Sequence, residues 1–209
     1  MKSIRILSFA LSLLATLFSF AQTGTAAPQT VPMTAILTPE FRISDPPEYL
    51  ITDFHVLLES SLVRNGVRIH NMQAVQKVLR HHRLPRLSQA SPAWYSAIGK
   101  ALQVQTLIQC AVTRFEVIET PYTISETGAS GIRRTGFAEG FVRVIATHTG
   151  ELLSTIPFRL EIDFRKLDRQ SVRDWQIDDY CRFMTENIIS GIVPELLKIP
   201  ELVKTSAKL

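Results

Sequence analysis

The sequence lacks the motifs that announce most enzymes, and it has few cysteines. It contains no G-x-S-x-G turn, no phosphate-binding loop, no H-E-x-x-H pair and no calcium-binding loop. Its two cysteines, Cys110 and Cys181, lack the spacing of metal ligands. The adjacent His81 and His82 would point about 100° apart on a helix, so they cannot both face one metal ion. We therefore predict no catalytic, cofactor-binding or metal-binding residue, and we expect that the protein is not an enzyme.

Long apolar runs are also scarce. The N-terminal run covers residues 6–20, which is shorter than the roughly 20 residues that a membrane-spanning helix needs. It follows the basic residues Lys2 and Arg5, and it ends on the small-x-small triplet Ser19-Phe20-Ala21 that signal peptidase recognises. We predict a cleavable signal peptide over residues 1–21, with an uncleaved N-terminal anchor as the alternative.

The predicted cleavage defines the domain organisation. A flexible lead-in is expected over residues 22–32, a single domain over 33–199 and a tail over 200–209; cleavage at Ala26 or Ala27 is the second choice. No cysteine lies near either cleavage site, so no lipid attachment is expected. These features predict an exported, periplasmic protein.

Net charge is low as well. The 23 basic and 19 acidic residues give a formal charge of +4 at pH 7, and loss of Lys2 and Arg5 with the signal peptide leaves +2. A balance this small does not predict nucleic-acid binding. No segment after the N-terminal run is long and apolar enough for a transmembrane helix.

Two interpretations of the cysteines remain open. In an oxidising compartment Cys110 and Cys181 could form a disulfide, and closing so long a loop would stabilise the fold by roughly 2–4 kcal/mol. Cys110 also lies in an apolar strand, and Cys181 lies on an apolar helix face. The alternative is therefore that both are buried thiols.

Hydrophobic periodicity predicts an α/β domain of the α+β type, with a mixed or antiparallel sheet and helices packed on it. The predicted order is β-α-β-α-α-β-β-β-α. Strands are expected at residues 33–43, 67–70, 106–119, 137–147 and 152–164, and helices at 48–64, 72–82, 92–102 and 172–193. Pro157 marks an edge strand or a bulge, and Pro194 is expected to end the last helix. Residues 120–136 are predicted to form a polar, mobile loop.

Three local phrases follow one another along the chain. They are Leu-Val-Arg-Asn-Gly-Val-Arg-Ile at residues 62–69, Ile-Gly-Lys-Ala-Leu at 98–102 before Val-Thr-Arg-Phe-Glu at 112–116, and Val-Arg-Val-Ile at 142–145 before Thr-Gly-Glu-Leu-Leu at 149–153. Their order resembles the CsgG family and its relatives, the LpoB-type activators, the flagellar FlgT middle domain and the TolB N-terminal domain. The resemblance implies an anticodon-binding-domain-like fold, and it concerns turns and core positions more than a site.

The resemblance also implies a function. We expect a non-enzymatic protein-interaction or assembly module of an envelope machine for secretion, flagellar assembly or cell-wall synthesis. Its expected partners are envelope proteins or further copies of itself, with peripheral outer-membrane or peptidoglycan association. The alternative is a CsgG-like subunit of an outer-membrane secretion channel. Two observations weaken that alternative. The chain lacks the lipid-bearing cysteine of the channel subunits, and the charges Glu126, Arg133 and Arg134 suit a lipid-facing hairpin poorly.

Two groups of basic residues are candidates for partner docking. Arg80, His81, His82 and Arg83, extended by Arg86, would form an anionic docking patch for an acidic partner or an envelope glycan; alternatively they are a basic helix end that complements the helix dipole. Arg133 and Arg134 belong to the predicted mobile loop, a reasonable place for partner contact.

Overall fold

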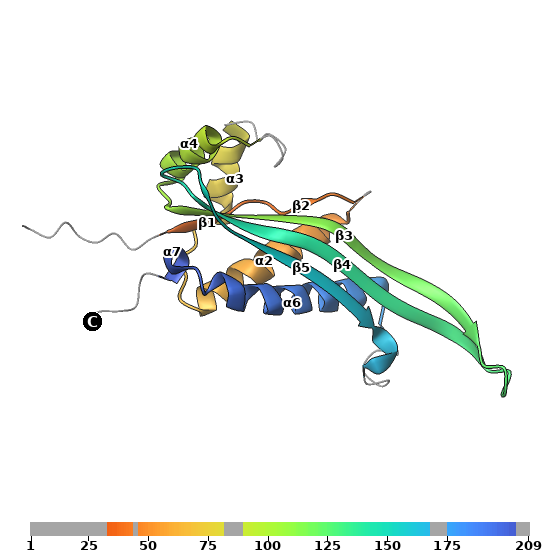
Figure 1. Cartoon of the computed structure of the whole chain (residues 1–209). Helices are drawn as coiled ribbons and strands as arrows, with labels where there is room; N and C mark the ends of the chain where they lie inside the picture. Colours follow the sequence, from red (N-terminus) through yellow and green to blue (C-terminus); the bar gives the residue numbers. More distant parts are fainter. Residues whose placement is uncertain (1–32, 44–45, 82–89, 168–174, 204–209) are drawn as a thin grey trace, which may run out of the picture. The chain divides into compact units, whose positions relative to one another are not determined.

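The structure is a computed structural model that describes residues 33–43, 46–81, 90–167 and 175–203. Within these residues the chain forms a mixed α/β fold, as predicted, with helices packed on a five-stranded sheet (Figure 1). The elements are β1 (Thr34–Ile36), β2 (Glu40–Phe41), α2 (Glu48–Arg64), α3 (Met72–His81), α4 (Pro92–Leu102), β3 (Thr106–Thr123), β4 (Ser130–Ala146), β5 (Leu152–Asp163), the 3-10 turn η2 (Phe164–Lys166), α6 (Ile177–Leu196) and α7 (Pro200–Val203).

The sheet has the order β1-β3-β4-β5, and β2 pairs with β3 beyond the end of β1. Strands β1 and β2 run parallel to β3, whereas β3, β4 and β5 are antiparallel neighbours. The single strand predicted over residues 33–43 is therefore wrong, because it is interrupted before Pro39, which has no N–H to give to a ladder. The strand predicted at residues 67–70 is reduced to a bridge between Thr34 and Ile69.

Several predicted helix boundaries are confirmed. Helix α2 begins and ends at the predicted residues. Helix α3 begins after Asn71, whose side-chain oxygen accepts the backbone N–H of Gln73 at 2.8 Å. Helix α4 begins after Ser91, whose hydroxyl accepts the N–H of Trp94 at 3.2 Å. A short polar side chain satisfies an otherwise unpaired N–H at each of the last two starts, which is why local sequence was enough to locate them.

Two cores lie on opposite faces of the sheet. Helices α2 and α6 cover one face, and their buried residues, including Phe54, Leu58, Met184 and Ile188, form the larger core. Helices α3 and α4 cover the other face, only near the start of β3, where Leu107 and neighbours form a smaller core (Figure 1). The α3–α4 pair therefore sits at one end of the sheet.

The β3–β4 hairpin is longer than predicted, and the mobile loop expected at residues 120–136 is wrong. Pairing continues to Thr123 opposite Ser130. The turn is closed by Ile124, whose N–H donates to the carbonyl of Ala129 at 2.8 Å. Gly128 has φ of +67°, a left-handed conformation that glycine adopts without a steric penalty. Residues that look like a polar loop are thus the end of a ribbon.

The C-terminal elements also differ from the prediction. Pro194 lies inside α6 instead of ending it, because the loss of one backbone hydrogen bond is offset by the burial of Val193 and Leu196 on either side. Helix α7 occupies the start of the expected tail, and Leu202 is buried in the larger core.

The two cysteines are free, buried thiols in the larger core. Burial raises the pKa of both Cys110 and Cys181, so neither favours the thiolate. The alternative of two buried hydrophobic thiols describes them in this structure, and the disulfide is not formed.

Candidate interaction surfaces

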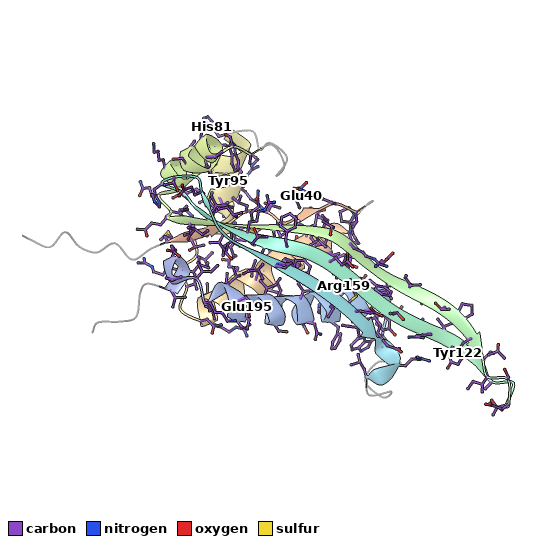
Figure 2. The ribbon with its side chains drawn as sticks, in the orientation of Figure 1. Glu40, His81, Tyr95, Tyr122, Arg159 and Glu195 are labelled. Atoms are coloured by element: carbon purple, nitrogen blue, oxygen red, sulfur yellow. The ribbon has the colours of Figure 1, made fainter. Side chains whose placement is uncertain are left out.

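The predicted docking residues fall into two groups that the structure does not bring together. Arg80 and His81 lie at the C-terminal end of α3. Arg133 and Arg134 lie on β4, near the other end of the sheet. Figure 2 shows this separation through the labels of His81 and Tyr122, a residue of the same hairpin. His82, Arg83 and Arg86 lie outside the described residues.

Arg133 has a carboxylate partner. Its guanidinium donates to Asp163 at 3.0 Å, at the end of β5. Asp163 also accepts the Arg165 guanidinium at 2.8 Å. The hydrogen bonds from Arg165, with the added charge of Arg133, hold the pKa of Asp163 well below its usual range. Arg133 therefore ties the hairpin to the end of β5.

Arg134 has partners of its own. Its Nε donates to Glu119 at 2.6 Å, across the hairpin, and its Nη1 donates to the hydroxyl of Tyr180 at 3.2 Å. The guanidinium also lies 5.4 Å from the centre of the Tyr180 ring. The hydrogen bond to Glu119 raises the pKa of Arg134 above its usual value. This arginine joins the hairpin to α6, so neither member of the predicted pair offers an unpartnered charge.

Beyond these ties the hairpin projects from the rest of the sheet. Strand β5 stops pairing at Thr135 opposite Asp163, so residues 118–134, here called the arm, form a two-stranded ribbon with a turn (Figure 1). Its large apolar side chains are exposed: Ile118 by 40%, Tyr122 by 41%, Ile124 by 41% and Ile132 by 54%. The arm is the first candidate surface.

The exposed side chains lie on both faces of the arm. Tyr122 is opposite Gly131, and its ring lies over that glycine, so that a Cβ there would be 2.9 Å from the tyrosine oxygen. Ile132 is opposite Pro121, on the other face, because neighbouring residues of a strand alternate between faces. Both faces of the arm therefore expose apolar side chains to solvent.

The α3–α4 end carries a second candidate surface, which we call the basic lobe and define as the described residues 64–81 and 90–104. Its described basic side chains are exposed: Arg64, Arg68, Lys77, Arg80 and Lys100. None of these five forms an ion pair with any described residue. By contrast, most described arginines outside the lobe are in ion pairs: Arg42, Arg114, Arg133, Arg134, Arg159, Arg165 and Arg182.

Of these five cations, only Arg80 was predicted as a docking residue. The sequence nevertheless distinguishes the whole lobe, because this part of the chain contains no acidic residue. Between residues 60 and 115 the chain has eight lysines and arginines and no aspartate or glutamate. Elsewhere from residue 22 onward it has 13 basic and 19 acidic residues. The small net charge of the whole chain does not reveal this separation, because the positive charge of residues 60–115 and the negative charge of the remainder nearly cancel.

A groove of about 540 Å³ opens on the lobe beside the β4–β5 turn. Its lining includes Lys100, Gln105, Thr147, His148 and Glu201. The hydroxyl of Thr147 already donates to the carbonyl of Val104 at 2.6 Å, so this polar group faces a backbone partner. The groove mixes charges of both signs and does not resemble a built anion site.

Two features are absent from the described residues. In that part of the chain no three histidine, cysteine, aspartate or glutamate side chains are grouped so as to hold a metal ion. Nor does any helix there have the length and apolar character needed to cross a membrane.

The fold resembles solved bacterial proteins, although no family model and no curated protein matches the chain. The hypothetical protein CT253 from Chlamydia trachomatis superposes with a TM-score of 0.52 at 12% identity, covering 81% of this chain and 98% of that one. Lipoprotein GNA1162 from Neisseria meningitidis gives 0.52 at 9% identity, covering 80% and 99%. The LpoB C-terminal domain from Escherichia coli gives 0.42 at 10% identity, covering 62% and 82%, which is too weak to carry an argument.

Identities this low establish a shared fold and nothing finer. Membership of the CsgG family specifically stays a prediction. The comparisons therefore place the chain among proteins with the fold of CT253 and of the lipoprotein GNA1162.

Proposed function

We propose that the protein is a non-enzymatic, periplasmic module that binds a protein partner in an envelope assembly, and that the arm is its contact surface. The observation that carries the proposal is the exposure of four large apolar side chains on a ribbon that no other described element covers. Exposed apolar residues gathered on one feature are typical of interaction sites. The predicted signal peptide supports the compartment, and the fold shared with a lipoprotein is compatible with it.

The arm is positioned before any partner binds. An isolated two-stranded hairpin is only marginally stable in water, so the arm depends on its base. There Arg133 and Arg134 fix it to β5 and to α6. A partner that covers the arm would bury its exposed isoleucines. Because the backbone of the arm is already ordered, binding would have a lower entropic cost.

Site-specific photo-crosslinking in cells tests the proposal. A photoreactive amino acid at Ile132, which is 54% exposed, is compared with the same group at Val56 on α2, which is 50% exposed. We expect a discrete adduct from position 132 alone, with a mass that differs from twice that of this chain. The double change of Tyr122 and Ile124 to aspartate should abolish that adduct.

Other outcomes would contradict the proposal. Equal crosslinking from positions 132 and 56, or an adduct that survives the two aspartates, would show that the arm is not the contact. Recovery of the protein only with detergent, as a ring of many copies, would instead favour the alternative of a secretion-channel subunit.

A further inference from the structure

We propose that the basic lobe binds the anionic headgroups of a phospholipid membrane, so that the protein attaches peripherally by its α3–α4 end. This inference rests on charge placement and is independent of the arm. The lobe combines five exposed cations with no described ion pair, in a segment that contains no acidic residue.

The cations are presented by helices whose apolar faces are already used. In α3 the buried side chains are Val75 and Leu79, which belong to the smaller core. Lys77 and Arg80 are exposed. Lys100 is exposed in the last turn of α4, where basic residues suit the helix dipole. On these two helices the cations are therefore exposed while the apolar side chains are packed in the smaller core.

The lobe offers charge without an apolar anchor. The large apolar residues that are exposed among the described residues include Val63 and Ile118, but none between them. Protein interfaces usually contain a central apolar or aromatic anchor, and their rim charges contribute little affinity. A surface of unpaired cations alone fits a partner that is itself a dense layer of charge, as an anionic membrane is.

The groove on the lobe argues against an acidic polypeptide as the occupant. Glu201 lines that groove together with Lys100, so its carboxylate would repel an acidic segment laid along it. A membrane surface would instead contact the outer ends of Lys77, Arg80 and their neighbours without entering the groove.

The charge of the remaining chain would orient the bound protein. Outside residues 64–104 the chain has 19 acidic and 14 basic residues from position 22 onward. An anionic surface would attract the lobe and repel the remainder. Because the arm lies at the other end of the sheet, this orientation would direct it away from the headgroups (Figure 1).

Vesicle co-sedimentation of the processed full-length protein tests the proposal. Binding to vesicles with 30 mol % phosphatidylglycerol is compared with binding to pure phosphatidylcholine vesicles, over a series of salt concentrations. We expect binding to the anionic vesicles only, and progressive loss as salt screens the charges. Each cation near such a surface contributes about a fivefold change in affinity. The triple variant Arg68→Gln, Lys77→Gln and Arg80→Gln should therefore bind about 100-fold more weakly.

A matched variant controls for net charge. Arg114→Gln, Arg159→Gln and Arg182→Gln remove three cations that lie in ion pairs outside the lobe; Arg159 and Arg182 are exposed, and Arg114 is half-buried. This variant should bind within about threefold of the unchanged protein, because the three charges lie outside the lobe and are already paired with carboxylates.

Several results would overturn the proposal. They are no binding to anionic vesicles at low salt, equal losses in the two triple variants, or binding that persists at high salt. Capture by immobilised poly-glutamate without any vesicle binding would assign the lobe to an acidic protein instead. Melting curves of both variants confirm folding, and the salt series of the unchanged protein tests the proposal even where a variant fails to fold. None of these results affects crosslinking through the arm.

Discussion

The basic lobe and the arm lie at opposite ends of one sheet, and they differ in how their charges are used. Both arginines of the arm are bonded to carboxylates, Arg133 to Asp163 and Arg134 to Glu119. In the lobe, exposed cations such as Lys77 and Arg80 form no ion pair with a described residue. The large apolar side chains that are exposed show the reverse distribution: four of them lie on the arm, and none lies on the described part of the lobe.

This difference separates two kinds of contact on one small domain. Paired charges at the base of the arm orient a ribbon, and its exposed apolar residues are suited to burial against another protein. Unpaired charges on the lobe suit a long-range, salt-sensitive attraction. High salt should weaken contacts of the lobe and leave contacts of the arm largely intact. The following changes test the comparison, beginning with the largest expected effect.

A substitution that displaces α4 of the lobe from the sheet should lower the free energy of unfolding more than any other change described below. A Cβ at Gly99 would overlap the side chain of Thr147, which is fixed to Val104. Gly99→Val should therefore lower the free energy of unfolding by about 3 kcal/mol through overpacking. Gly191→Ala in α6 is the control, because nothing lies within 4 Å of the added methyl group, and it should stabilise by up to about 1 kcal/mol. Urea titrations measure both, and equal effects would contradict the close packing of α4.

A change at the end of the arm should have a smaller and more local effect. Gly128→Val places a branched side chain at φ of +67°, which costs roughly 1–2 kcal/mol. Because the arm projects from the body, amide exchange should accelerate in residues 118–134 while the melting temperature hardly changes. Ser125→Val, in the same turn, is the control. A large loss of global stability would show that the arm is part of the main cooperative unit.

Between the two ends, His55 of α2 should make the folding stability depend on pH. Burial lowers the pKa of His55, which lies on the inner side of α2 near Glu59 at 3.5 Å. The unfolded chain therefore binds a proton more readily than the folded one as pH falls below about 6.5. The stability that the neutral imidazole provides is complete above that value and declines with acidification until the folded pKa is passed.

Substitution of that histidine should flatten the pH dependence. The melting temperature of His55→Leu should vary less between pH 7 and pH 5 than that of the unchanged protein. His148→Leu, on the exposed β4–β5 turn, should retain the original slope. If both variants or neither flattened the curve, His55 would not be the responsible group.

The smallest effects concern the charges themselves. Arg134→Gln removes bonds to Glu119 and Tyr180 and should cost roughly 0.5–1 kcal/mol, in the range of partly exposed ion pairs. Arg68→Gln in the lobe should change stability by less than about 0.5 kcal/mol, because that exposed side chain forms no ion pair with a described residue. Thermal melts at low salt compare them, and an equal cost would remove the distinction between the two ends.

Much of the fold could be predicted because it depends on local patterns. The spacing of Leu50, Phe54, Leu57, Leu58 and Leu62 located α2, and all of these side chains except the partly buried Leu57 are buried. The alternation along β5 predicted a strand, and Pro157 predicted that it is an edge strand or has a bulge; β5 pairs with β4 alone and is an edge strand. Such signals lie within one element, so a short window of sequence contains them.

The arm could not be predicted in the same way. Glu119 and Arg134 look like loop charges when each is considered in its own segment. In the structure they are opposite each other across the hairpin, so each neutralises the other on a strand surface. The register that joins them depends on Gly128 and on the whole length of β3 and β4, which no local window includes.

The sequence by itself determined helices α2, α3 and α4 and the separation of charge between residues 60–115 and the remainder, because composition and periodicity are properties of the chain alone. Only the tertiary structure decided which charges are neutralised and which remain exposed. Ion pairing depends on distances of a few ångströms between residues far apart in sequence, such as Arg133 and Asp163. Those distances are set by strand register and helix packing.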